Sequence, residues 1–242
     1  MLRDYQQNAI NMLYDWFRGN ASGNPCLVLP TGSGKSHVVA ALCKDALQSW
    51  PETRVLMLTH QAELIEQNAE KMLLHWPNAP MGIYSASLGK RDLSQPITFA
   101  GIGSVRTRAG EIGHVDLVLV DEAHCISGRA EGGYRNLIAG LTEINPRLRV
   151  IGLTATPYRL GQGYVTDGEQ ALFKALIEPV TISHLINVGH LCELRSKSTD
   201  VHYDVSGVRT RAGEFVEKDL QAAVSDELTN REAVQEIVAR AG

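Results

Sequence analysis

Residues 26–39, CLVLPTGSGKSHVV, contain the pattern that decides the fold. Four apolar residues come first, a turn with two glycines follows, and apolar residues with helical spacing continue beyond it. The pattern G-x-x-x-x-G-K-[ST] between a buried strand and a helix is typical of a loop that holds nucleotide phosphates. Leu29 replaces the first glycine, and residues 30–36 keep the rest of the pattern. An ordinary turn is the alternative, and the joint occurrence of strand, loop and helix argues against it.

The residue types in this loop suit phosphate binding. Gly32 and Gly34 let backbone N–H groups approach phosphates where a Cβ atom would clash. Lys35 would lie against the β- and γ-phosphates, and the Ser36 hydroxyl would bind Mg²⁺. A helix that begins at Lys35 also directs the positive end of its dipole toward the same anion. The loop therefore predicts a site for a nucleoside triphosphate.

A second motif is DLVLVDEAHCI, residues 116–126, in which an apolar strand ends in two adjacent carboxylates. Ligands of parallel sheets bind at the carboxyl ends of the strands. Neighbouring side chains at a strand end point in different directions, so Asp121 can reach toward Mg²⁺ while Glu122 reaches toward an attacking water. An ordinary acidic junction between strand and loop is the alternative, and the phosphate loop earlier in the chain argues against it.

Composition excludes several classes of protein. The four cysteines are scattered without a C-x-x-C spacing, which argues against a zinc site and a disulfide framework and fits a reducing cytosol. No apolar run is long enough for a membrane span, and the chain does not begin with a signal peptide, so we expect no membrane contact. The net charge of −4 requires any nucleic-acid partner to meet a local basic surface or backbone N–H groups.

Strand and helix patterns alternate along the first 157 residues, which predicts a parallel α/β sheet covered by helices on both faces. The expected strands are 26–29, 54–58, 81–84, 97–100, 116–120 and 149–153, and the expected helices are 4–18, 35–48, 61–75 and 134–144. The alternation then loosens into a helical and extended C-terminal extension. There we expect helices at 169–176, 181–188 and 215–241, and an extended segment at 193–203.

Three motifs in order, PTGSGKS, VDEAH and GLTATPYR, resemble motifs I, II and III of superfamily 2 helicases, the DEAD/DEAH-box proteins. The resemblance covers nearly the whole chain and implies the first RecA-like motor domain. The strings LTATPYRLGQGY and ISHLINVGHL look most like RadD-like bacterial and phage-borne helicases. That resemblance implies a cytoplasmic protein encoded by a bacterium or a phage.

The resemblance also implies roles for individual residues. The leader LRDYQ resembles the Q-motif, in which Arg3 and Gln6 would contact adenine. The full set of residues expected at Mg²⁺–ATP is Arg3, Gln6, Thr31, Gly32, Ser33, Gly34, Lys35, Ser36 and His37, with Ser36 and Asp121 on the metal. Lys35, Asp121 and Glu122 would carry hydrolysis. His124, Thr154 and Thr156 would couple the nucleotide site to nucleic acid.

Contacts to nucleic acid are expected at residues that follow strands in this resemblance. They are His60, Gln61, Ser104, Arg106 and Arg159. The string VRTRAGE occurs at 105–111 and again at 208–214, and we interpret the first copy as a phosphate contact and the second as a solvated loop. Contacts to phosphates carry no base sequence information, so we expect binding without sequence preference.

These observations predict a nucleic-acid-dependent ATPase that moves along or remodels DNA, with RNA as the alternative partner. Two other functions stay open at this stage: an ATP-gated nucleic-acid-binding module without hydrolysis, and the motor part of a restriction-type assembly. The intact pair of carboxylates favours an enzyme over a binding module.

The expected domain organisation comprises a leader helix at 1–24, the RecA-like motor domain at 25–160, an extension at 161–205 and a helical linker at 206–242. A complete motor of this superfamily has a second RecA-like domain, which supplies an arginine to the γ-phosphate from a pattern like Q-x-x-G-R-x-x-R. No such pattern follows motif III, and the nearest string is Gly128-Arg129. We therefore expect the chain to lack the second domain and to be nearly inactive alone.

Overall fold

The computed structural model describes residues 2–20, 22–126, 132–159, 163–193, 201–211 and 214–240. The chain divides into two units, residues 1–191 and residues 192–242. The first unit contains the leader, the phosphate loop and all three motifs. Gly128-Arg129 lies outside the described residues. The finer domain boundaries expected from the sequence stay a prediction.

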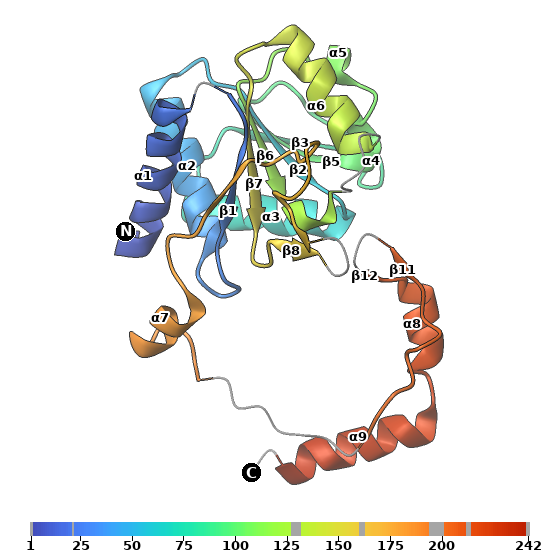
Figure 1. Ribbon diagram of the computed structural model, residues 1–242. Coiled ribbons are helices and arrows are strands. Elements are labelled where there is room, and N and C mark those ends of the chain that lie inside the picture. Colours follow the sequence, from blue (N-terminus) through green and yellow to red (C-terminus); the bar gives the residue numbers. More distant parts are fainter. Residues whose placement is uncertain are drawn as a thin grey trace. The chain divides into compact units, whose positions relative to one another are not determined.

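An eight-stranded sheet forms the centre of the first unit (Figure 1). Its order is β10-β1-β7-β6-β2-β5-β3-β4, and neighbouring strands are parallel except β3 and β4. The strands are β1 Pro25–Val28, β2 Val55–Thr59, β3 Met81–Ser85, β4 Lys90–Arg91, β5 Ile97–Gly101, β6 Leu117–Asp121, β7 Arg149–Thr154 and β10 Ala175–Ile177. The predicted parallel α/β sheet is confirmed.

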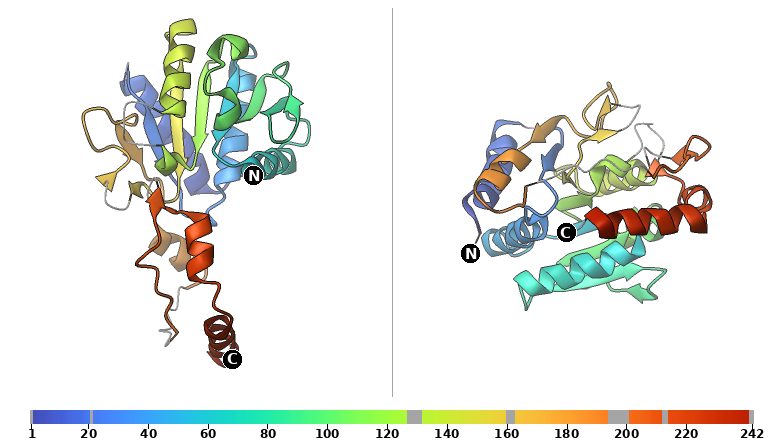
Figure 2. Two further views of the ribbon diagram at one scale, coloured as in Figure 1. Left: turned by 90° about the vertical axis from the view of Figure 1, so that its right-hand side faces the viewer. Right: turned by 90° about the horizontal axis from the view of Figure 1, so that it is seen from below.

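Helices cover both faces of this sheet (Figure 2). One face is covered by α1 Asp4–Gly19, α2 Lys35–Ser49 and α3 Ala62–His75, and the other by α4 Ile102–Val105, α5 Ala109–Ile112 and α6 Gly133–Ile144. Successive strand residues point to opposite faces, so Leu27 packs under the first group of helices and Cys26 under the second. This two-sided burial explains why the strands are apolar without alternation.

The shorter elements of the first unit follow motif II and motif III. A 3₁₀ turn, η1 Ala123–Cys125, comes directly after β6, and the small hairpin of β8 Tyr158–Arg159 and β9 Gly163–Tyr164 comes after β7. The helix expected at 181–188 is present as α7 Ile182–Asn187, with the Thr181 hydroxyl as its N-cap.

The expectation of a helix at 169–176 is wrong. Phe173 is completely buried there, and β10 pairs in parallel with β1 at the edge of the sheet. Pairing with an existing strand outweighs the local helical pattern, because the edge of β1 would otherwise be left without partners. Of the extended segment expected at 193–203, residues 194–200 lie outside the described residues.

The second unit contains a short hairpin and two helices. The hairpin strands are β11 Thr210–Arg211 and β12 Glu214–Phe215, and the helices are α8 Glu217–Ala223 and α9 Glu227–Arg240. The single helix expected at 215–241 is therefore divided at residues 224–226. Arg209 pairs with Asp219 at 2.6 Å, which favours the interpretation of the second VRTRAGE copy as a solvated loop. Within the described residues no helix is long and apolar enough to cross a membrane.

Packing around β7 generates a stability prediction. A Cβ atom at Gly152 would lie 2.6 Å from Cζ of the buried Phe173 ring and 3.0 Å from the Ala123 Cβ. We expect Gly152→Ala to lower the free energy of unfolding by about 1–3 kcal/mol, as overpacked cores do. Gly110→Ala, where a Cβ atom meets nothing within 4 Å, is the matched control and should change it by less than about 1 kcal/mol. Urea unfolding measures both, and equal stabilities would contradict this account of the core.

Candidate nucleotide and nucleic-acid site

The motif residues gather at the carboxyl edge of the sheet because the strands that carry them are parallel and in register. Val28 of β1 lies opposite Thr154 of β7, and Leu153 of β7 lies opposite Asp121 of β6. The Leu29 N–H donates to the Thr154 carbonyl at 2.9 Å, which extends the pairing into the loop. Motifs I, II and III therefore end side by side, although long segments of chain separate them.

The phosphate loop needs its two glycines for backbone conformation and for space. Gly32 and Gly34 have φ values of +79° and +85°, in the left-handed region that favours glycine. A Cβ atom at Gly34 would lie 2.5 Å from the Gln6 Nε2 atom. Gly34 is also the N-cap of α2, so the loop passes directly into the helix that begins at Lys35.

The leader helix is fastened to this loop. The Ser33 carbonyl accepts hydrogen bonds from the Tyr5 hydroxyl at 2.6 Å and from Gln6 Nε2 at 2.9 Å. Gln6 Oε1 accepts from the Arg3 N–H at 2.9 Å, and the Arg3 guanidinium donates to the Tyr5 oxygen at 3.3 Å. Both polar groups of the Gln6 amide thus have partners. The predicted contact with adenine would require Gln6 to give up its hydrogen bond to Ser33 or to Arg3.

Lys35 holds both carboxylates of motif II. Its Nζ lies 2.9 Å from Asp121 Oδ1 and 3.0 Å from Glu122 Oε1. Burial alone would lower the pKa of Lys35, but the two carboxylates raise it above its ordinary value. Burial would likewise raise the pKa of Asp121, and the ammonium, together with hydrogen bonds from Asn68 and from the Glu122 N–H, lowers it. Both groups are therefore charged at neutral pH.

The backbone at Glu122 is unusual. Glu122 is the only non-glycine residue with a positive φ in the described part of the chain. Its φ is +48° and its ψ is +54°. A side chain in this left-handed region is strained, and such strain concentrates at functional sites. The turn directs one Glu122 oxygen to Lys35 and brings the other to 3.4 Å from His124 Nδ1.

Oxygen ligands suited to Mg²⁺ lie next to Lys35. A cavity of about 10 Å³, the scale of one water molecule, is lined by Lys35, Ser36, Asn68 and Asp121 among others. A hydroxyl and a carboxylate are the hard ligands that Mg²⁺ takes, so the side chains present fit that ion. Sequence reasoning missed Asn68, whose Nδ2 donates to Asp121 Oδ2 at 2.8 Å, because it belongs to no motif.

A chain of hydrogen bonds joins motifs II and III. His124 Nδ1 lies 2.9 Å from Thr154 Oγ1, and the same hydroxyl contacts the Thr156 backbone N–H and carbonyl. The Arg159 Nε donates to the His124 carbonyl at 3.1 Å. The residues expected to couple the nucleotide to nucleic acid are thus in direct contact.

The five residues expected at nucleic acid differ in accessibility. Gln61 and Arg106 are exposed, and His60 is half-buried with an Nδ1 that has no partner among the described residues. The Ser104 hydroxyl already accepts from the Ala86 N–H. Arg159 is 7% exposed, which makes it the least accessible of the five.

Four residues of the expected nucleotide set are exposed, namely Arg3, Thr31, Gly32 and His37. The His37 ring stacks on His75 with 3.4 Å between ring centroids, which ties the start of α2 to the end of α3.

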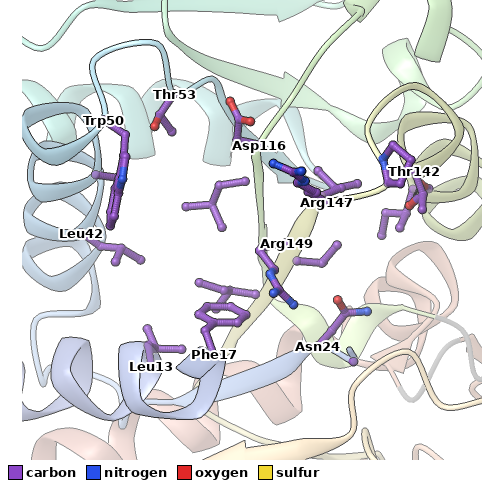
Figure 3. A pocket seen from close by; sticks show the side chains of 18 of the residues that line it. Leu13, Phe17, Asn24, Leu42, Trp50, Thr53, Asp116, Thr142, Arg147 and Arg149 are labelled. Carbon is purple, nitrogen blue, oxygen red and sulfur yellow. Dashed lines mark hydrogen bonds between the residues drawn. The ribbon is translucent and has the colours of Figure 1, made fainter. Parts of the chain in front are cut away.

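A larger cavity lies elsewhere, at the amino edge of the sheet (Figure 3). It has a volume of about 1040 Å³ and is lined by residues such as Leu13, Phe17, Trp50 and Arg149. Arg149 lies over the Phe17 ring at 5.4 Å. None of the residues expected at nucleotide or nucleic acid lines it. Size alone is therefore a poor guide to the site of this chain.

The ion pairs of Lys35 generate a prediction about pH. Because the pKa of Asp121 is lowered, its contribution to stability is present above the ordinary carboxyl pKa of about 4 and is lost as pH falls. We expect Lys35→Met to reduce the free energy of unfolding at pH 7 by about 1–3 kcal/mol, less than for a fully buried pair. The difference from the wild type should shrink as the pH falls below about 4. Urea unfolding at several pH values measures this, with the exposed Lys71→Met as control. A deficit that does not change with pH would contradict it.

Comparison with known proteins identifies the family of this chain. Residues 1–159 match the family described as type III restriction enzyme, res subunit. A 51.5 kDa protein of a Lactococcus phage (isolate 7-9) is 27% identical over 212 residues, which are 88% of this chain and 40% of that protein. The chain thus spans less than half the length of this relative.

Solved structures show the same fold. The UvsW helicase of bacteriophage T4 superposes with a TM-score of 0.55 at 19% identity, over 73% of this chain and 60% of that one. The type ISP restriction-modification enzyme LlaGI, solved with a DNA substrate mimic, gives a TM-score of 0.55 at 16% identity over 78% of this chain and 20% of that one. The chain belongs to the family of the res subunit of type III restriction enzymes, and its first unit has the RecA-like fold of superfamily 2 helicases.

Proposed function

We propose that this chain binds Mg²⁺–ATP at residues 31–37 and couples its hydrolysis to movement along DNA or to its remodelling. The observation that carries the proposal is the contact of Lys35 with Asp121 and Glu122 beside the Ser36 hydroxyl, at the end of a glycine loop. Phosphoryl transfer needs a phosphate cradle, a metal ligand and a group that positions water, and these residues supply all three.

The side chains have separable roles in this proposal. Lys35 exchanges its carboxylate partners for the β- and γ-phosphates, which frees Asp121 and Ser36 to hold Mg²⁺. The bound ion would neutralise phosphate charge. Glu122, whose second oxygen lies toward His124, accepts a proton from the attacking water and holds that water in line.

Nucleic acid would bind at the same edge of the sheet, mainly through backbone phosphates. Backbone N–H groups at the start of α3, near His60 and Gln61, hold a phosphate without needing positive charge, which suits a chain with a net charge of −4. Arg106 adds an exposed cation at the end of α4. DNA is the proposed partner, supported by the LlaGI complex with a DNA mimic, and RNA is the alternative.

Hydrolysis at full rate would require an arginine from a second RecA-like domain. Within the described residues no arginine forms a hydrogen bond or ion pair with Lys35, Asp121 or Glu122. The match to a restriction-enzyme family also supports a second candidate, the motor part of a restriction-type assembly in the cytoplasm of a bacterium or infected cell. The narrower resemblance to RadD-like helicases stays a prediction.

Nucleotide binding is the first test of this proposal. We expect Lys35→Ala to weaken ATP binding at least about tenfold, because a charged hydrogen bond to phosphate is lost. Glu122→Gln should retain ATP binding, since it removes a negative charge close to the phosphates. Titration calorimetry with Mg²⁺–ATP measures both variants, and unchanged affinity in Lys35→Ala would remove the basis of the proposal.

Turnover separates an enzyme from an ATP-gated binding module. An arginine from a second domain contributes about 10³–10⁵ in rate, which is about 4–7 kcal/mol of barrier. We therefore expect these 242 residues to hydrolyse ATP very slowly, with little stimulation by single-stranded DNA and no activity in Glu122→Gln. Fast, DNA-stimulated turnover in a steady-state assay would show that the chain supplies its own arginine.

The nucleic-acid face can be tested with two neighbouring arginines. Arg106 is exposed without an ion pair among the described residues, whereas Arg108 is paired with Glu111 at 2.7 Å. We expect Arg106→Gln to lower the slope of log affinity against log salt by about 0.9 for duplex DNA, the value of one phosphate contact. Arg108→Gln should change the slope less. Fluorescence anisotropy at several salt concentrations measures both, and the opposite order would place the phosphate contact at Arg108.

A further inference from the structure

A second cavity at the carboxyl edge lies on the face of the sheet covered by α4 and α6. It has a volume of about 260 Å³, and Arg106, Cys125, Gly133, Tyr134 and Arg135 are among the residues that line it. None of the residues expected at ATP, Lys35 and Ser36 included, is among the residues that line it. This cavity, called here the arginine pocket, is therefore separate from the nucleotide loop, although both adjoin motif II.

Positive charge is concentrated around the arginine pocket. Arg106 and Arg135 line it, and Arg159 lies nearby. Burial lowers the pKa of Arg159 first of all, and the charge of Arg135 lowers it further, which places the two guanidinium groups near each other. Within the described part of the chain none of the three forms an ion pair with a carboxylate. The negative charge of Asp167 acts on Arg159. The positive charge of Arg106 and Arg135 at the pocket itself favours binding of an anion.

Two buried polar atoms at the pocket lack hydrogen-bond partners. They are the Tyr134 hydroxyl and the Arg135 Nε, and the Tyr134 residue as a whole is only 9% exposed. Buried polar atoms without partners are rare and costly in folded proteins, so each requires an explanation. A ligand that accepts hydrogen bonds explains both atoms together.

The start of α6 adds backbone donors to the same place. This helix has 12 residues, its N-cap Gly132 offers no side chain to the first turn, and no acidic residue lies in that turn. Its first N–H groups have no acceptor within the helix, and the helix dipole favours an anion there. A Cβ atom at Gly133 would lie 3.2 Å from the Arg106 Cβ, so glycine lets Arg106 approach the helix start.

We propose that the arginine pocket binds one phosphate group of a nucleic-acid backbone, with Arg106, Arg135 and the Tyr134 hydroxyl as donors. This inference rests on the proposed function and adds Tyr134 and Arg135 to the nucleic-acid face. A backbone phosphate suits the pocket because it is anionic and accepts several hydrogen bonds. The nucleic-acid strand that carries it would continue past Gln61 and Arg106 at the same carboxyl edge of the sheet.

The pocket also offers a route from nucleic acid to motif II. Cys125 lines it, and Arg159 donates to the carbonyl of the adjacent His124. A phosphate that draws Arg135 toward itself lowers the repulsion at Arg159. In this proposal Arg159, which is only 7% exposed, acts through its hydrogen bond to the His124 carbonyl.

The test uses Tyr134→Phe and Arg135→Gln, with Arg147→Gln at the opposite edge of the sheet as a control of equal charge change. Anisotropy with a labelled single-stranded oligonucleotide is measured over a range of salt concentrations. We expect Arg135→Gln to weaken binding about tenfold and to lower the salt slope by about 0.7. Tyr134→Phe should weaken binding about fivefold without changing the slope, and Arg147→Gln should change neither.

The thermal unfolding midpoint of the free protein provides a second measurement. A structural role of the Tyr134 hydroxyl predicts a lower midpoint in Tyr134→Phe, whereas the proposed role does not. If the Tyr134 hydroxyl has no partner until a ligand binds, Tyr134→Phe keeps or raises the midpoint while binding weakens. A lowered midpoint with unchanged binding would overturn the proposal and make the hydroxyl structural.

The remaining outcomes separate this inference from the proposed function. Unchanged affinity and slope in both variants, with nucleic acid still bound by the wild type, would overturn the pocket and leave the proposed function standing. Failure of the wild type to bind ATP would contradict the proposed function. Inorganic phosphate could instead raise the thermal unfolding midpoint of the wild type but not of Arg135→Gln, while both proteins bind the oligonucleotide equally. That result would assign the pocket to free phosphate and overturn its assignment to a backbone phosphate.

Discussion

The register of three neighbouring strands, β1, β7 and β6, is the constraint on which the candidate site depends. Lys35 follows β1 and Asp121 ends β6, so their 2.9 Å contact spans the strand that lies between them. A slip of one residue in either pairing would turn every side chain of a strand to the opposite face. It would also move the strand ends apart. The buried apolar faces of the strands fix the register, and the core thereby fixes the site.

The buried Asp121 carboxylate is paired with a positive charge before any ligand arrives. Asp121 is 5% exposed, and an unpaired carboxylate there would take up a proton or destabilise the fold. The Lys35 ammonium removes that cost and keeps the carboxylate ionised, which is the form that a divalent cation requires. Under the proposed function, the same ammonium can then pair with phosphates. The negative phosphates would replace Asp121 as the partner of Lys35, and the accompanying divalent cation would replace Lys35 as the partner of Asp121.

The site was more predictable than the regions around it, for physical reasons. Asp121 and Thr154 are the last residues of β6 and β7, and Lys35 begins the helix after the loop that follows β1. The apolar runs that predict the strands therefore also place these residues. Asn68 could not be found, because its contact depends on how α3 packs and no local pattern records that packing. The 169–176 segment was misassigned for a related reason. Its helical spacing is local, whereas its pairing with β1 spans most of the chain.

Residues of motif II contact groups on both faces of the sheet within a few positions, which gives the strained backbone at Glu122 a structural reason. The nucleotide loop and Lys35 belong to the face under α2, and Cys125 lines a pocket on the face under α6. A regular strand would continue outward beyond the sheet. A single left-handed residue followed by a 3₁₀ turn reverses the direction within three residues. The strain therefore lies in the segment that joins the partners of Lys35 to the lining of the arginine pocket, and under the proposed function a change in one site would alter the other there.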